Sequence, residues 1–138
     1  MVELKDVEFM TAQDKARVLR QWEGFLKGGL KWEQFHSKLY EHLHLHCGFI
    51  GHYNRRGFYL TCFQTGTGVE DFIYFFNESI RQQATYINWD YQDINTAMAH
   101  TLAKYSLALL EQARQSQRDA DIAKALRLLS KHEIPLQV

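Results

Sequence analysis

The stretch DYQDINTAMAHTLAKYSLALLEQARQS, residues 90–116, contains neither glycine nor proline and predicts one long helix. One face of this helix carries apolar residues at helical spacing: Ile94, Met98, Tyr105 and Leu109. The opposite face carries a second series of small or apolar residues: Ala99, Ala103, Leu107 and Leu110. A helix that is apolar on two sides is either central in a bundle or part of an interface. We therefore predict a helix over 91–116 in one of these two positions.

The helical pattern continues beyond residue 116, but its apolar stripe changes direction. Ile122, Leu126 and Leu129 are offset from the preceding stripe by roughly a quarter turn, at 3.6 residues per turn. Residues 116–119, Ser-Gln-Arg-Asp, have the spacing of a capping pattern at a helix start. We therefore expect a break near residues 116–119, followed by a separate helix over 119–132.

Three further helices are predicted upstream, over residues 11–27, from 30 to 47 or 48, and over 68–82. The first begins at a capping box formed by Thr11 and Asp14, and a glycine pair follows its end. The third begins at a second capping box, formed by Thr67 and Glu70. The segment between the second and third helices allows two structures: a pair of short aromatic strands around an Asn-Arg-Arg-Gly turn, or a loop and a short helix.

These elements predict an all-α fold: a single domain over residues 1–138, built as a bundle of about five helices. A small β-hairpin near residues 48–63 is possible within it. The composition agrees with a globular domain, because 46% of the residues are hydrophobic and 23% are charged.

The sixteen basic and sixteen acidic residues give a formal net charge of zero, which argues against nucleic acid as a partner held by the overall field. No apolar run approaches the roughly 20 residues needed to span a bilayer, and the N-terminus does not resemble a signal peptide. The two cysteines suit reduced thiols in a chain large enough to fold without disulfides. We expect a cytoplasmic protein without a membrane partner.

The aromatic residues are numerous: nine Phe, seven Tyr and three Trp. A domain of this size has little interior for so many rings, so an oligomer interface or a ring-lined pocket is expected. Together with the two-faced helix, this favours a non-enzymatic protein-interaction or regulatory module. Its expected partner is a second copy of itself, as a homodimer, or another protein. Whether the protein is an enzyme stays open.

Four of the seven histidines fall within residues 42–52. His42 and His46 stand four residues apart at the edge of the apolar stripe of the second helix, the spacing that lets two imidazoles reach one ion. With His52 as third ligand they would form a transition-metal site for zinc or iron, in a metal-binding protein or metalloenzyme. The simpler interpretation is structural: His42 extends toward solvent and His46 is a core-edge histidine bonded to a backbone carbonyl.

Two further groups of residues suggest phosphate or nucleic-acid chemistry. Tyr53, Arg55 and Arg56 place two guanidinium groups beside a stackable ring and could hold a phosphate or a base, although a solvated turn explains them equally. Arg127 and His132 have the spacing of a signature of certain small all-α ribonucleases, where such a pair would provide acid–base catalysis. At the end of the last helix these two residues also simply suit the helix dipole. A nucleic-acid-acting protein is thus the second alternative.

Overall fold

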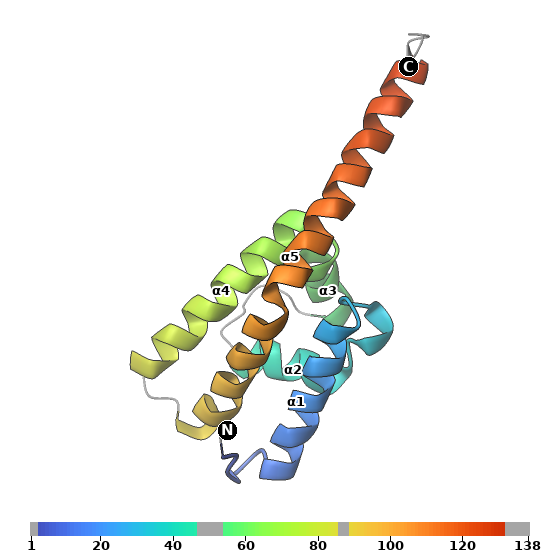
Figure 1. Ribbon diagram of the computed structural model, residues 1–138. Helices are drawn as coiled ribbons and strands as arrows, with labels where there is room; N and C mark the ends of the chain where they lie inside the picture. Colours follow the sequence, from blue (N-terminus) through green and yellow to red (C-terminus); the bar gives the residue numbers. More distant parts are fainter. Residues whose placement is uncertain (1–2, 47–53, 86–88, 132–138) are drawn as a thin grey trace.

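The computed structural model describes residues 3–46, 54–85 and 89–131, except for the side chains of residues 46, 82–85 and 89. Within these ranges the chain forms five α-helices and one short 3₁₀ helix, with a single isolated antiparallel bridge between Val7 and Met10. The all-α prediction is confirmed (Figure 1).

Helix α1 (Ala12–Lys27) forms where the sequence predicts it. The Thr11 side chain accepts a hydrogen bond from the backbone N–H of Asp14, and the Asp14 carboxylate accepts one from the Thr11 N–H, which completes the capping box. The helix ends at Gly28, and the next two residues adopt left-handed backbone angles, with φ of 85° at Gly29 and 65° at Leu30. These angles turn the chain away from the helix axis.

The second helix is shorter than predicted. A 3₁₀ helix, η1 (Trp32–Gln34), precedes α2 (Ser37–His46), so the helix does not begin near residue 30. The left-handed Leu30 and the non-helical Phe35, with φ of −90° and ψ of 77°, interrupt the pattern. Leu39 and Leu43 nevertheless face the core as the apolar stripe predicts.

The hairpin considered for residues 48–63 is wrong in the part that the structure describes. Residues 55–63 form helix α3 (Arg55–Phe63), whose first turn is capped by the Asn54 side chain at 2.6 Å from the Gly57 N–H. Asn-Arg-Arg-Gly is therefore a helix start and not a turn between strands. Residues 47–53, which would have formed the first strand, lie outside the described residues.

Helix α4 (Gly66–Thr85) begins before the predicted residue 68. Its cap is Thr65, whose hydroxyl accepts from the Gly68 N–H at 2.9 Å, and not the predicted box of Thr67 and Glu70. The predicted core stripe is otherwise correct, because Phe72 and Phe76 are buried.

Helix α5 (Trp89–Lys131) is continuous over 43 residues, so the predicted break near residues 116–119 is wrong. At that point Gln115 and Gln117 donate side-chain hydrogen bonds to Asp119 and Asp121, each four residues ahead, as neighbours on one helix do. Up to Ala113 the helix packs on the other helices; residues 114–131, here called the extension, leave them (Figure 1). We call the described residues up to 113 the body.

The core of the body is built largely of stacked and edge-to-face rings. The indole of Trp22 lies between Phe72 and Phe76, with centroid distances of 6.0 and 5.6 Å. A second group joins α1 to α3, with Phe25 and Phe63 at 4.9 Å in edge-to-face geometry. The aromatic surplus therefore fills the interior to a large extent, while Phe9, Tyr74 and Phe75 stay exposed.

Candidate functional site

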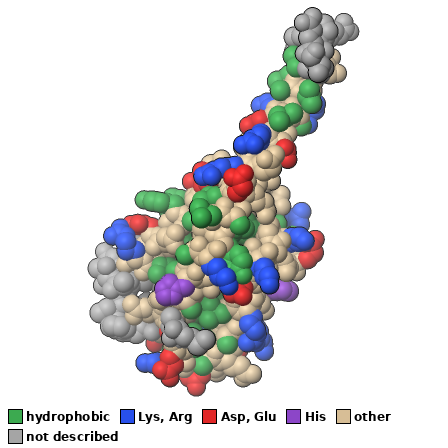
Figure 2. All heavy atoms as spheres, in the orientation of Figure 1, with side chains coloured by type: hydrophobic (Ala, Val, Ile, Leu, Met, Phe, Trp, Pro, Cys, Tyr) green, Lys and Arg blue, Asp and Glu red, His purple; other side chains and the backbone are tan. Residues whose placement is uncertain are grey.

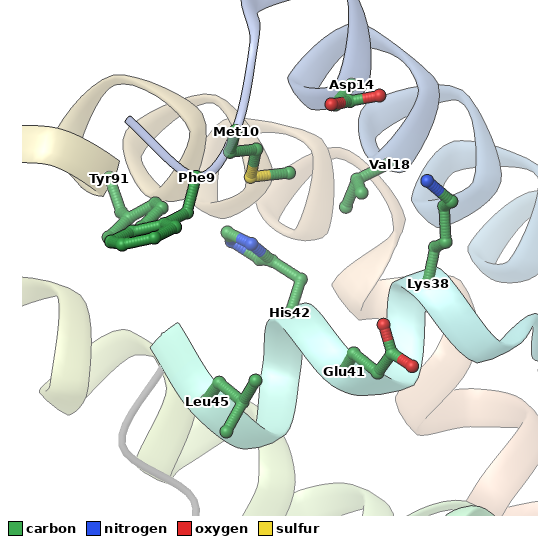
Figure 3. A pocket seen from close by; sticks show the side chains of 9 residues that line it. All are labelled: Phe9, Met10, Asp14, Val18, Lys38, Glu41, His42, Leu45 and Tyr91. Atoms are coloured by element: carbon green, nitrogen blue, oxygen red, sulfur yellow. The ribbon is translucent and has the colours of Figure 1, made fainter. Parts of the chain in front are cut away.

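A cavity of about 400 Å³ lies where α2 faces the segment before α1 and the start of α5 (Figure 3). Its walls are mostly apolar, with Phe9, Met10, Val18, Leu45 and Tyr91 around the side chain of His42. Phe9 and Leu45 are 83% and 66% exposed, so the mouth of the cavity is apolar as well. The charged lining residues are Asp14, Lys38 and Glu41.

His42 is the buried polar group of this cavity, with 2% of its surface exposed. Its Nε2 lies 2.7 Å from Oδ1 of Asn95, which is also buried, and since a carbonyl oxygen can only accept, Nε2 donates in this bond. The ring meets Tyr91 edge-on at 6.2 Å. These contacts fix the imidazole between α2 and α5, so the expectation that His42 extends toward solvent is wrong.

A buried ion pair lies near the same end of α5. Lys15 of α1 is fully buried, and its ammonium group is 2.9 Å from the Asp93 carboxylate and donates to the Asp90 carbonyl at 2.6 Å. Burial raises the pKa of Asp93, but the Lys15 ammonium and the backbone N–H groups of Lys5 and Ile94 together outweigh it. The pKa of Asp93 therefore lies below its ordinary value.

This arrangement suits binding and positioning better than catalysis. No serine, threonine or cysteine is among the described residues that line the cavity. The imidazole hydrogen-bonds to an amide, which holds the ring but does not raise its basicity as a carboxylate would. The cavity can therefore hold a small apolar group beside one oriented imidazole.

The predicted metal site is only partly within view. His42 is placed as described above, whereas the side chain of His46 and the whole of His52 lie outside the described residues. Among the side chains that the structure describes, no three His, Cys, Asp or Glu residues gather closely enough to hold an ion. A zinc or iron site of His42, His46 and His52 stays a prediction.

The predicted ligand site has its two arginines at the start of α3. The guanidinium groups of Arg55 and Arg56 lie 4.6 and 5.7 Å from the centroid of the Trp32 ring, and Arg55 also donates to the Phe35 carbonyl at 3.2 Å. Arg55 therefore joins α3 to the segment before α2. Tyr53 lies outside the described residues, and so does His132 of the other predicted pair, whose Arg127 is exposed on the extension.

The second face of α5 is open to solvent. Leu107 is 84% exposed, and on the extension Ile122, Leu126 and Leu128 are 52%, 44% and 48% exposed. Figure 2 shows hydrophobic side chains at the surface of the extension. Every described residue from 114 to 131 is exposed except Leu129, which is half-buried. The structure thus leaves the two-faced helix with one face on the core and the other without cover from the described part of the chain.

The sequence analysis missed the buried ion pair and the partner of His42. Lys15 could have been found, because it lies one turn before Val18 and two turns before Trp22 on the core stripe of α1. A charged residue at such a position requires a buried partner. Nothing in the sequence identifies Asp93 or Asn95 as that partner.

No helix of the described residues has the length and apolarity required to cross a bilayer. Comparison with protein-family models, with curated proteins and with solved structures finds no match to this chain.

Proposed function

We propose that the protein is a non-enzymatic interaction module that associates with a second copy of itself through the open face of α5. The observation that carries this proposal is the exposure of apolar side chains along one helix, from Leu107 in the body to Ile122 and Leu126 in the extension. A helix that projects alone into solvent normally has polar residues all round.

Association would remove this apolar surface from water. Complete burial of a leucine or isoleucine side chain is worth about 1.5–3 kcal/mol relative to exposure. Because a two-fold dimer uses each residue twice, a few such side chains supply a substantial part of the free energy of association. The free thiol of Cys62, buried in the core, supports placing this module in the reducing cytoplasm.

Light scattering coupled to size-exclusion chromatography tests the proposal. The full chain at about 100 µM is expected to have twice the mass of one chain, and Leu107→Asp or Ile122→Asp should return it to a monomer. Neither residue packs in the core, so circular dichroism and the melting temperature of the monomeric variant should change little. Leu60→Asp is the matched control, because Leu60 is 45% exposed but belongs to α3. A wild-type chain that is monomeric at every concentration would refute self-association.

A further inference from the structure

We propose that the second copy lies antiparallel along α5, with Glu111 of each chain opposite Arg118 of the other. This inference rests on the proposed function and names the orientation and register of its interface. The outer face of α5 comprises the residues within about 40° of one direction on the side away from the core, at 100° per residue. These residues are His100, Lys104, Leu107, Glu111, Arg118, Ile122, Ala125 and Leu129.

The outer face is accessible over its whole length. All its members are exposed except the half-buried Leu129, and the exposed ones include His100, Lys104 and Leu107 within the body. A second helix can therefore follow α5 past the extension and along the side of the body.

The order of residues on the outer face is complementary to itself when reversed. Apolar positions lie toward both ends, with Leu107 on one side and Ile122 on the other, and two opposite charges, Glu111 and Arg118, lie between them. A two-fold axis between residues 114 and 115 places Leu107 opposite Ile122 of the second copy. The same axis places Glu111 opposite Arg118 of the second copy, and symmetry repeats both pairs.

Other arrangements lack this match. Parallel helices in register place Glu111 against Glu111 and Arg118 against Arg118, and like charges across an interface are unfavourable. An antiparallel register displaced by one turn, with the axis between 116 and 117, places the Glu111 carboxylate against the apolar Ile122. The proposed register pairs opposite charges and apolar side chains at the same time.

The bodies do not collide in this register. Residue 113 of one α5 lies beside residue 116 of the other, so each body flanks the extension of the second copy. The two helices overlap over residues 98–131, about 51 Å at 1.5 Å per residue. With a helix diameter of about 11 Å, the contact buries on the order of 1,100 Å² in total, which is typical of a reversible complex.

Complementary charge reversals test the register. Glu111→Arg alone places two arginines opposite each other in both symmetric pairs, and Arg118→Glu alone places two glutamates there. Each single variant should therefore dissociate at least about tenfold more readily than the wild type. An equimolar mixture of the two variants should dimerise again, because the mixed dimer keeps one pair of opposite charges reversed and the mutual repulsion of each homodimer is removed when the charge pairs are shared between unlike chains. The double variant Glu111→Arg/Arg118→Glu should also dimerise, because it exchanges the two charges and keeps every pair attractive. Sedimentation equilibrium between about 5 and 200 µM measures all four samples.

Lys124→Glu is the control, because Lys124 is exposed on the same helix but points away from the outer face. It should leave the dissociation constant unchanged. If Leu107→Asp abolishes the dimer but the double charge variant stays monomeric, self-association stands and the antiparallel register is wrong. Unimpaired dimerisation of either single charge variant also overturns the register, and a monomeric wild type overturns both proposals.

Discussion

Replacement of Asp93 by asparagine should destabilise the fold far more than a surface substitution does. Asp93 is the counterion of Lys15, whose ammonium is fully buried and 2.9 Å from the carboxylate. Asparagine keeps the shape of the side chain but leaves the Lys15 charge without a counterion. Removal of one partner from a buried ion pair costs about 3–5 kcal/mol, and Asp93 is 14% exposed, so we expect about 3 kcal/mol.

The size of the effect is measurable by thermal unfolding. At about 2.1 cal/mol/K per residue, the unfolding entropy of 138 residues converts this cost into a fall in Tm of about 10 °C. Lys15→Met should cost less, since it removes the buried charge itself and leaves Asp93 with the N–H donors of Lys5 and Ile94. Adding Lys15→Met to Asp93→Asn should therefore restore part of the lost stability.

The destabilisation should also depend on pH. The pKa of Asp93 is lower in the folded chain, so its contribution is complete above the unfolded pKa near 4 and is lost as the pH falls through the folded value. Melting curves by circular dichroism at pH 7, 5 and 3.5 should show a constant gap between wild type and Asp93→Asn at the first two values and a smaller gap at the third. A variant that melts within about 2 °C of the wild type at pH 7, well below the shift expected from the unfolding entropy, would refute the reasoning, and so would a gap that widens in acid.

Two other changes have definite expected outcomes. A Cβ at residue 68 would lie 2.3 Å from the Thr61 carbonyl, so Gly68→Ala should cost about 2–3 kcal/mol in urea unfolding; Gly24→Ala, with nothing within 4 Å, should be neutral or slightly stabilising. Burial raises the pKa of the Cys62 thiol to about 12, so in a Cys47→Ser chain at pH 8 a thiol reagent should label Cys62 only as fast as the chain unfolds, and rapid labelling of the folded chain would contradict its burial.

Local signals in the sequence were sufficient for α1. The capping box at Thr11 and the glycine pair after Lys27 act within a few residues, so both helix ends could be predicted. Helix α3 could not be assigned in the same way, because a short aromatic run suits a strand or a buried helix equally. Its state depends on Phe58 and Tyr59 packing on Phe35, more than 20 residues away.

The break predicted within α5 was wrong for a different reason. A change in the direction of an apolar stripe indicates a new helix only when every apolar residue faces the same core. Here the stripe of Ile122 and Leu126 belongs to a part of the helix that has left the body. The polar contacts of the candidate site join residues far apart in the chain, with Lys15 and Asp93 78 residues apart and His42 and Asn95 53 apart. One sequence contains no signal for such pairings.

The extension also has a mechanical consequence. From Ala113, the last buried residue of α5, to Lys131 the helix is about 27 Å long at 1.5 Å per residue. A tilt of α5 by about 10° about Ala113 displaces its far end by about 5 Å, by simple geometry on that length. Helix α5 thus acts as a lever arm: a small repacking around Tyr91 and His42 at its other end, passed along a rigid rod, becomes a displacement as large as a whole helical turn.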